Sequence, residues 1–534
     1  MHKNIIVPAF ALAAVTPVIA QKKSAKKATD QAYNVVFFMC DQLSSRALSM
    51  WDPNNNTIRV PNMERLAREG ATFINSVCVV PFSSPSRASF VTGMYPNTHG
   101  ILLNVSREDT PPLDPAIPTT EGELYKQGYA TAFFGKWHLG HIQSWECYKN
   151  TSEDGNTVFE SRYADLRRSK NHTALPPPPG EVLVEPDRDQ GYGFYMDEYL
   201  YEKMQNAPTE HIRRKLALSE VGRFGVPVEL DNWTLCNQDG IDFIRANRDR
   251  PFMATISLHP PHIPFAVQEP YFNMVTPEDI YLPPSAFDKP MWSGDQELSK
   301  YIGEKGVRLR LRSYYAQIRY IDDMLGRVLK ALDDLKLTDK TLVIFTADHG
   351  DPIGSHGLLF DKLLNNFIEE LTLAPTLMRL PGVIPAGRKV QAHLNSVDFG
   401  PTILDYLGKP ILPTMQGRSM KPILDGTQKD EVGFAICMRP FARMIRGEIN
   451  GKIYTYTKVF SIKRNRVLAE ELFNITDDFY QRTDQIENPA YKSIKERLIA
   501  EYNRYADRYG DRRMEDLPAQ GLPTTGNIPP ALMK

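Results

Sequence analysis

The chain has 534 residues, of which 42% are hydrophobic, and its 63 Lys and Arg residues nearly balance 64 Asp and Glu residues. A formal net charge of −1 argues against a protein that binds nucleic acid through one broad basic face. At about 100–200 residues per domain, the length predicts several domains, or one large catalytic domain with an appendage. The five cysteines are scattered and form no Cys-x-x-Cys pair, which argues against a zinc ribbon or a disulfide framework.

Residues 1–20 have the pattern of a secretory signal peptide. One basic residue, Lys3, precedes a mostly apolar stretch from 5 to 19, and the segment ends in short side chains. The stretch is too short for a comfortable membrane span, and Pro8 and Pro17 interrupt it. We therefore predict that the segment is cleaved and that the mature protein is soluble and exported, without stable membrane insertion.

Four apolar runs have the composition of buried parallel strands, at residues 34–39, 129–134, 252–258 and 342–346. A cluster of reactive polar residues follows each run at once. The clusters are Asp41-Gln42, Lys136-Trp137-His138, His259-Pro260-Pro261-His262 and Asp348-His349-Gly350-Asp351. Because open α/β sheets bind ligands at the carboxyl ends of their strands, we expect all four clusters at one edge of one sheet.

Helical segments fit between these runs. The segment 61–69 begins with a proline and stops at Gly70, as helices often do. The segment 308–335 repeats apolar residues at helical spacing and should pack on the sheet just before the last strand. Its apolar stripe consists of Ile318, Ile321, Leu325, Val328, Leu329 and Leu332.

Two regions differ from this α/β pattern. Residues 141–235 contain a run of prolines, many charges and little periodicity, so we expect a loop-rich insertion that shapes substrate choice. Residues 431–534 predict a smaller C-terminal α+β subdomain, with a charged helix over 490–509, which leaves 31–430 as the catalytic domain. The subdomain's short antiparallel strands are expected at 433–437, 451–457 and 467–473.

The most informative stretch is Ser83-Ser84-Pro85-Ser86-Arg87-Ala88-Ser89-Phe90-Val91-Thr92-Gly93. Pro85 can open a helix, which places Ser83 at the helix N-terminus, where backbone N–H groups and the dipole favour an anion. Arg87 lies one turn further and can point the same way. Taken alone, the pattern favours an ordinary serine-rich helix cap.

Together with other motifs, this stretch resembles the signature of the sulfatases of the alkaline phosphatase superfamily: Cys or Ser, any residue, Pro, Ser, Arg, then several residues before Thr-Gly. The matching residues are Ser83, Pro85, Ser86, Arg87, Thr92 and Gly93. The resemblance runs from about Asn34 to the C-terminal region. The accompanying motifs are Asp41, the 61–70 helix, Pro96 with His99-Gly100, Gly135-Lys136-Trp137-His138, Pro261-His262, Phe345-Thr346-Ala347-Asp348-His349-Gly350 and Lys362. The resemblance implies an α/β fold of the alkaline phosphatase type, in which helices flank a large mixed β-sheet. It also implies an enzyme that hydrolyses sulfate monoesters.

The family oxidises the signature Cys or Ser to formylglycine, whose hydrated geminal diol attacks the sulfate sulfur. The resemblance therefore implies that Ser83 is the precursor of the nucleophile. A serine at this position points to the serine-type maturating enzyme of anaerobic bacteria, and so to the periplasm of a Gram-negative anaerobe. The alternative is an unmodified Ser83 that acts as an alkoxide, as in phosphatase relatives.

The resemblance also implies a metal site, formed by Asp41, Gln42, residue 83, Asp348 and His349. Mostly oxygen donors with flexible geometry suit one Ca²⁺ ion, with Mg²⁺ and Mn²⁺ as alternatives. The family often has Asp in place of Gln42 and Asn in place of His349, so this chain loses one carboxylate and gains one imidazole. A cation here would lower the pKa of the diol.

The remaining pocket residues that the resemblance implies are Arg87, Lys136, His138, His262 and Lys362. The three cationic side chains would neutralise the sulfuryl oxygens. His138 would take the diol proton, and His262 would serve as general acid toward the leaving alcohol. Three further histidines, His99, His259 and His356, lie near the site in sequence without an assigned task.

Three arginines at the start of the C-terminal region, Arg439, Arg443 and Arg446, allow two interpretations. They can reach over the pocket to an anionic sugar, or they can belong to a solvated edge strand. The second interpretation is the simpler one, and the sequence favours it.

The leading hypothesis is a formylglycine-dependent sulfatase that acts on a sulfated carbohydrate such as a mucin, a glycosaminoglycan or an algal glycan. The alternative is a phosphodiesterase or phosphonate monoester hydrolase on the same fold. Two-zinc members of the superfamily need an extra Asp-x-x-x-His set, and residues 187–249 show no convincing example. A glycan-binding protein without catalysis is a third hypothesis, but it predicts missing ligands, and this sequence retains almost all of them.

Overall fold

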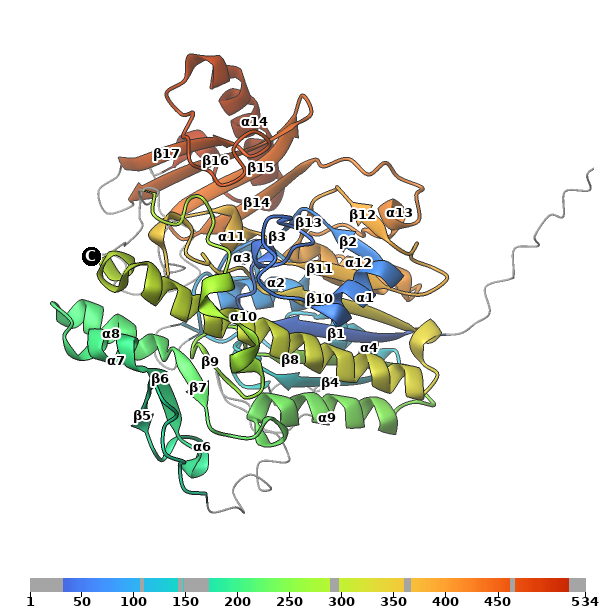
Figure 1. Ribbon diagram of the computed structural model, residues 1–534. Helices are drawn as coiled ribbons and strands as arrows, with labels where there is room; N and C mark the ends of the chain where they lie inside the picture. Colours follow the sequence, from blue (N-terminus) through green and yellow to red (C-terminus); the bar gives the residue numbers. More distant parts are fainter. Residues whose placement is uncertain are drawn as a thin grey trace, which may run out of the picture. The chain divides into compact units, whose positions relative to one another are not determined.

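The computed structural model describes residues 32–105, 110–142, 147, 172–288, 297–359, 366–461 and 466–517. The predicted signal peptide, Lys362 and most of residues 141–171 lie outside these ranges. The central sheet has seven strands in the order β12-β2-β11-β10-β1-β8-β4 (Figure 1). The strands are β12 (Arg388–Val390), β2 (Ala71–Phe73), β11 (Thr376–Arg379), β10 (Thr341–Ala347), β1 (Asn34–Cys40), β8 (Phe252–Leu258) and β4 (Ala130–Gly135).

The four strands predicted from apolar runs form the parallel centre of this sheet. β10, β1, β8 and β4 pair in parallel in that order, and each strand ends within about one residue of its predicted range. Every residue of β1 is buried, because both faces of the sheet are covered, and this explains a run that is apolar throughout. The prediction of one sheet with all four strands is confirmed.

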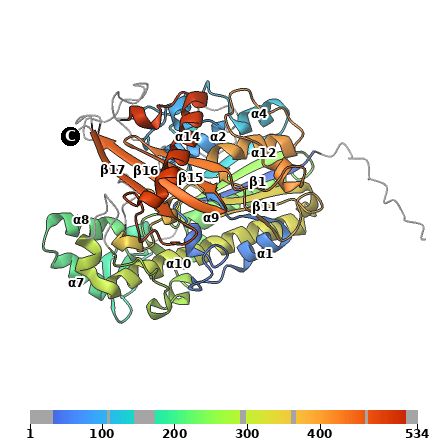
Figure 2. The same cartoon turned by 90° about the horizontal axis from the view of Figure 1, so that it is seen from above.

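Helices cover both faces of the sheet. They are α1 (Pro61–Glu69), α9 (Asn232–Ala246) and α10 (Glu297–Asp334) on one side, and α2 (Ser83–Thr92), α4 (Thr120–Lys126) and α12 (Phe399–Tyr406) on the other. Val36 and Phe38 of β1 pack in the core with the first set. Val35 and Phe37 pack with the second set, as the alternation of side chains along a strand requires. Figure 2 shows the two helical layers with the sheet between them.

The helices predicted at 61–69 and 308–335 are both present. The long one, α10, begins earlier than expected, at Glu297, and Gly303 with φ 64° and ψ −176° interrupts its helical geometry. Gly303 and Gly306 lower the helix propensity of this first part, which is why sequence spacing did not reveal it. The predicted apolar stripe is buried throughout. Among the helices in the described ranges, none combines the length and apolar character needed to cross a membrane.

The expectation of a loop-rich insertion is wrong for residues 172–235. This part forms a second sheet, in the order β5-β6-β7-β9. Its elements are β5 (Glu181–Glu185), α6 (Arg188–Gly191), β6 (Phe194–Asp197), α7 (Glu198–Gln205), α8 (Glu210–Ser219) and β7 (Gly222–Phe224), and β9 (Ala266–Gln268) completes the sheet. Strands of 3–5 residues are too short to produce a recognisable alternation of apolar residues.

The C-terminal region forms an antiparallel sheet in the order β14-β15-β16-β17. Its elements are β14 (Phe434–Arg439), β15 (Ala442–Ile449), β16 (Lys452–Ser461), β17 (Arg466–Asn474) and α14 (Lys492–Tyr509). Leu498 and Tyr502 of α14 pack on one face, and the other face packs through Cys437 on Val77. All these elements were predicted from the sequence except β15. This strand was missed because it carries buried arginines, and arginine is typical of solvent-exposed positions.

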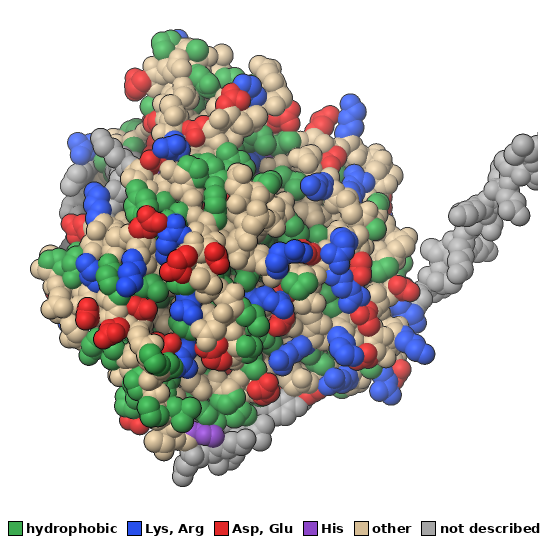
Figure 3. Space-filling view, viewed as in Figure 1, with side chains coloured by type: hydrophobic (Ala, Val, Ile, Leu, Met, Phe, Trp, Pro, Cys, Tyr) green, Lys and Arg blue, Asp and Glu red, His purple; other side chains and the backbone are tan. Residues whose placement is uncertain are grey.

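Charge on the surface follows the composition. On the face shown in Figure 3, Lys and Arg side chains are interspersed with Asp and Glu side chains, as the net charge of −1 leads one to expect. In the interior, one buried ion group joins β15 of the C-terminal sheet to the segment that follows β1. Glu369 accepts hydrogen bonds from Arg46 (2.8 Å) and from Arg446 of β15 (2.6 Å). Burial alone would raise the pKa of Glu369, but Arg446 and Arg46 hold it below its ordinary value.

Glu369→Gln should lower the free energy of unfolding by about 3–5 kcal/mol, because it leaves two buried guanidinium groups without their counter-charge. Urea unfolding followed by circular dichroism measures the difference. Glu448→Gln, at an exposed position of β15, is the matched control and should stay within about 0.5 kcal/mol of the wild type.

The wild type and Glu369→Gln together also test how the free energy of unfolding depends on pH. Because the folded-state pKa of Glu369 lies below the unfolded-state value of about 4.3, its contribution is fully present above that pH. It is lost as the pH falls through the folded-state pKa. The gap between wild type and Glu369→Gln should therefore close in acid, and a gap that is independent of pH contradicts the assignment.

Candidate active site

The carboxyl ends of the parallel strands bring most of the predicted site residues together. Helix α2 starts at the same place, so its first residue, Ser83, faces the ends of the strands. The residues that follow the strands directly are Asp41 and Gln42 after β1, Lys136 after β4, and Asp348 and His349 after β10. This arrangement is the one predicted from the order of strands and polar clusters.

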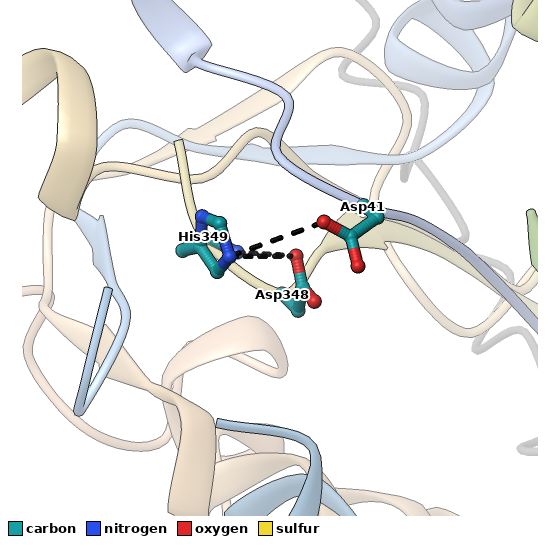
Figure 4. A group of neighbouring side chains, drawn as sticks. All are labelled: Asp41, Asp348 and His349. Atoms are coloured by element: carbon teal, nitrogen blue, oxygen red, sulfur yellow. Dashed lines mark hydrogen bonds and ion pairs between the residues drawn. The ribbon is translucent and has the colours of Figure 1, made fainter. Parts of the chain in front are cut away.

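Asp41, Asp348 and His349 form a buried group that fits a metal ion. One ligand atom of each lies within 4.8 Å of the others, and Figure 4 shows the three side chains pointing toward one another. His349 Nε2 lies 3.9 Å from Asp41 Oδ1 and 3.8 Å from Asp348 Oδ1. Ligand atoms that each bind an ion at about 2.0–2.6 Å are separated by distances of this size. Two carboxylates and one imidazole therefore suit a divalent cation.

The tautomer of His349 supports a ligand role for its Nε2 atom. Nδ1 lies 2.8 Å from the carbonyl oxygen of Gly350, and because a carbonyl only accepts, Nδ1 must carry the proton. Nε2 then presents its lone pair toward the two carboxylates and toward Ser83 Oγ, which is 3.3 Å away. A backbone carbonyl that fixes the ring in this way is typical of metal-binding histidines.

Gln42 is held in a conformation that a side chain rarely adopts. Its φ is 67°, a left-handed value that costs about 1–3 kcal/mol and is often found at functional sites. Its Nε2 donates to Asp351 Oδ2 at 2.6 Å, and Asp351 in turn pairs with Arg310. Because the amide nitrogen must face this carboxylate, the orientation of the amide is fixed. Oε1, the atom able to bind a cation, lies on its other branch.

Ser83 lies at the start of α2 and is fully buried. Its Oγ is 3.2 Å from Asp41 Oδ2. The helix dipole and the first N–H groups of α2 favour negative charge at this position. Two neighbouring serines fix the helix, because Ser84 Oγ donates to the carbonyl of His138 and Ser86 Oγ to that of Asp348, both at 2.6 Å. Neither contact could be predicted from the sequence, because both partners lie far away along the chain.

Arg87 binds the ends of all four parallel strands. Its Nε donates to Asp348 at 2.9 Å and its Nη2 to Asp41 at 3.1 Å. Its Nη1 donates to the carbonyl of Lys136 at 2.6 Å and to Ser257 Oγ, on β8, at 2.8 Å. A guanidinium has five N–H donors, so these bonds occupy four of them. The structure thus gives Arg87 a positioning function that the sequence did not predict.

Lys136 is the second buried cation of this group. Its Nζ lies 2.6 Å from Asp41 Oδ2. Burial, together with the charge of Arg87, lowers the pKa of Lys136, although Asp41 opposes the effect. Two cations thus balance the charges of Asp41 and Asp348. A divalent cation added to this group leaves a positive excess, which an anionic substrate group can neutralise.

His138 lies beside this group, because its imidazole is close enough to Lys136, Arg87 and Asp41 for their charges to shift its pKa. Burial, then the charges of Lys136 and Arg87, lower the pKa of His138 to about 2, so its imidazole is neutral at ordinary pH. His262 lies on the loop after β8, where its Nδ1 is 2.9 Å from His259 Nε2. Lys362, the last of the predicted catalytic residues, lies outside the described residues.

Comparisons with known proteins agree with this geometry. The sulfatase family model matches residues 33–409, and the model of the N-sulphoglucosamine sulphohydrolase C-terminal domain matches 354–507. The chain belongs to the sulfatase family. It is therefore an enzyme, a sulfuric ester hydrolase. Membership implies a formylglycine residue and a divalent metal ion, and Asp41, Asp348 and His349 offer a site for that ion.

Individual relatives cover most of the chain. An ulvan-active sulfatase of Formosa agariphila is 28% identical over 495 residues, which are 90% of this chain and 82% of that protein. An N-acetylglucosamine-6-O-sulfatase of Bacteroides thetaiotaomicron is 26% identical and covers 91% of this chain and 84% of its own length. A phosphonate monoester hydrolase structure from Silicibacter pomeroyi has a TM-score of 0.68 at 19% identity, covering 91% of this chain and 97% of its own. The predicted alkaline-phosphatase-like fold is confirmed.

One further expectation for this sulfatase is wrong, and one histidine without an assigned task gains a function. The arginines of β14 and β15 are buried rather than solvated, so the interpretation as a solvated edge strand is wrong. Arg443 pairs with Asp511 and Arg446 with Glu369, which shows that both arginines stabilise the fold. His99 also has a structural function, because its Nε2 bonds Ser89 Oγ and its Nδ1 accepts from the backbone N–H of Ile101.

His349→Ala should lower the affinity of the sulfatase for a divalent cation by about 100-fold or more, because changes in the supporting shell of a metal site alone cost 10–100-fold. Isothermal titration of the chelator-treated enzyme with CaCl₂ and then MgCl₂ measures this without an activity assay. His211→Ala, at an exposed position of α8, should bind both ions as the wild type does. Unchanged affinity in His349→Ala would remove His349 from the ligand set.

Proposed function

We propose that this sulfatase hydrolyses sulfate monoesters on a sulfated carbohydrate, such as a mucin, a glycosaminoglycan or an algal glycan. The observation that carries the proposal is the position of Ser83 Oγ, at the start of α2 and within 3.3 Å of both Asp41 and His349. The carbohydrate substrate is supported by the two relatives whose names refer to ulvan and to N-acetylglucosamine 6-O-sulfate.

We infer that Ser83 is the residue that is oxidised to formylglycine by a serine-type maturating enzyme. The hydrated aldehyde supplies a nucleophilic oxygen and a second hydroxyl through which the covalent sulfate can be released. Asp41, Gln42, Asp348 and His349 would hold one metal ion next to residue 83. Ca²⁺ is the ion that this mostly oxygen donor set favours, and it supplies positive charge that lowers the pKa of a hydroxyl on residue 83.

The cations of the site orient the sulfate group. Lys136 Nζ and Ser83 Oγ both contact Asp41 Oδ2. The ammonium group of Lys136 can therefore reach a sulfuryl oxygen of an ester bound next to Ser83. Lys362 keeps the same proposed task on the basis of the sequence motif. Arg87 acts through Asp41 and Asp348 rather than on the substrate, because protein groups occupy four of its five donors.

Two histidines are proposed for proton transfer. His138 holds a neutral imidazole beside the helix start, and it is proposed to accept a proton from residue 83. A bound sulfate ester adds negative charge close to Lys136 and Arg87, and this offsets the two cations that disfavour the protonated imidazole. His262 is partly exposed on the loop after β8, and it is proposed to protonate the leaving alcohol.

The second sheet adjoins the proposed leaving-group side. Trp233, at the start of α9, stacks on His259 with 5.5 Å between ring centroids, and β9 begins shortly after His262 and pairs with β7. We therefore propose that residues 141–235 shape the choice of sugar. Residues 31–430 are the proposed catalytic domain and 431–534 the proposed C-terminal subdomain. The proposed location is the periplasm of a Gram-negative anaerobe, after removal of the signal peptide.

Mass spectrometry tests the nucleophile. After co-expression with a serine-type maturase, the peptide that contains Ser83 should be lighter by the mass of two hydrogen atoms. Ser83→Ala should lower kcat by about 10⁴-fold or more, as removal of a nucleophile does in other enzymes, whereas Ser493→Ala, at an exposed position of α14, should be fully active. An unmodified Ser83 in fully active enzyme would exclude the formylglycine mechanism and favour the alkoxide alternative.

A substrate panel tests the reaction class, because the phosphonate monoester hydrolase of similar fold keeps the alternative open. We expect kcat/KM for 4-nitrocatechol sulfate to exceed that for bis(4-nitrophenyl) phosphate and for 4-nitrophenyl phenylphosphonate. A panel of defined sulfated mono- and disaccharides then identifies the sugar and the sulfated position. A preference for the phosphorus esters would establish the alternative function.

A further inference from the structure

A cavity of about 350 Å³ lies at the end of α2 that is opposite to Ser83. Its walls come from Tyr95, which follows α2, from segments 393–398 and 416–418, from β14 and from α14. Tyr95 lies beyond the last turn of the 10-residue helix α2, so at 1.5 Å per residue it is about 15 Å from the start of that helix, and none of the described residues that line the cavity contacts Ser83. The cavity is therefore distinct from the group around Ser83, and its volume lies within the range of small-molecule sites.

Three tyrosines form an aromatic cluster in this cavity. The ring centroids of Tyr95, Tyr505 and Tyr509 lie 4.8–5.3 Å apart. Gln416 fixes two of them. Its side-chain oxygen accepts a hydrogen bond from the backbone N–H of Tyr95 (2.7 Å), and its backbone carbonyl accepts one from the hydroxyl of Tyr509 (2.9 Å). Rigid aromatic side chains with polar hydroxyl groups suit the C–H faces and hydroxyls of a sugar ring.

Two arginines give the cavity its charge. Arg418 and Arg508 are exposed at the cavity, and over the residues that the structure describes, neither forms an ion pair with a carboxylate. Arg418 Nη2 donates to the carbonyl of His393 at 3.0 Å, and the guanidinium of Arg508 lies 5.1 Å from the ring centroid of Tyr509. Both guanidinium groups are thus held at the cavity by neutral groups.

The carboxylates at this cavity are already bonded. Asp398 accepts from the backbone N–H groups of Asn395 and Arg418, both at 2.8 Å. Glu501 forms ion pairs with Arg497 and Arg504. Asp398 is thus held by backbone groups and Glu501 by two other arginines, so neither carboxylate forms an ion pair with Arg418 or Arg508.

We propose that this cavity is an accessory binding site for an anionic oligosaccharide, whose sugar rings pack on the tyrosines and whose sulfate or carboxylate groups pair with Arg418 and Arg508. The inference rests on the proposed function, because a sulfated glycan chain then supplies the ligands of both sites. Contact at the second site makes productive binding of a long chain an intramolecular event, which raises its apparent affinity without a new contact at Ser83.

Binding of dextran sulfate to the full-length mature enzyme tests the proposal, with uncharged dextran as the comparison. Titration is carried out in the Ser83→Ala background with excess 4-nitrocatechol sulfate, which then occupies the site around residue 83 without being hydrolysed. The single variant Arg508→Ala should weaken dextran sulfate binding by about tenfold or more, and the double variant Arg418→Ala/Arg508→Ala by more than that. A hydrogen bond to a charged group is worth about 1.5–3 kcal/mol, and 1.4 kcal/mol is a factor of about ten. With Ser83 intact, the kcat/KM for 4-nitrocatechol sulfate should not follow this change.

A matched control removes two exposed arginines in and just after α9, in the other helical layer, as Arg245→Ala with Arg248→Ala. It should bind dextran sulfate as the wild type does. An equal loss of dextran sulfate affinity in both double variants would mean that only the net charge of the protein matters. Wild-type affinity in the Arg418/Arg508 variant would exclude the cavity as the binding site. Either result overturns the accessory site. Failure of the wild type to hydrolyse the aryl sulfate would instead contradict the proposed function, so the two failures are distinguishable.

Discussion

The arrangement of the active site depends on the guanidinium of Arg87. Its bonds reach Asp41 after β1, Asp348 after β10, the carbonyl of Lys136 after β4, and Ser257 on β8. Parallel strands are paired along their lengths, but nothing in that pairing fixes the loops beyond their ends. The buried guanidinium of Arg87 fixes these loops, because its N–H donors are held in one plane and bind groups from several loops at once. Because Arg87 lies one turn into α2, the same side chain also sets the distance between Ser83 and the carboxylates that face it.

Charge balance then explains why this buried group is stable and why it suits an anion. Two carboxylates face two buried cations, so each charge has a partner close by and the cost of burial is offset. A metal ion held by Asp41, Asp348 and His349 would shift this balance toward positive charge, and a sulfate ester would restore it. Selectivity for an anion would then arise from a local excess of charge, which a net charge of −1 over the whole chain does not reveal.

Sequence was sufficient where burial dictates the residue type. β8 could be predicted to the residue, because a strand covered on both faces must be apolar throughout, and the strand ends in turn located the polar clusters. Sequence was insufficient where a polar side chain is buried by a distant partner. Arg443 and Arg446 of β15 meet Asp511 and Glu369, and Ser257 meets Arg87 across 170 positions of chain. Such pairs have no local signature, so β15 was missed and the contacts of Arg87 with the four strand ends could not be predicted.

Helix α2 connects the two anion sites of this sulfatase. Its first residue is Ser83, and the residues after its last turn, Gly93 and Tyr95, contact the segment at Gln416 that forms part of the accessory cavity. All ten of its residues are buried, and Ser84, Ser86 and Arg87 bind it to the strand ends. The spacing between the sites is therefore set by one rigid helix rather than by a hinge between domains. A glycan chain that engages both sites must match this fixed spacing, so substrate length enters the specificity of the enzyme alongside the position of the sulfate.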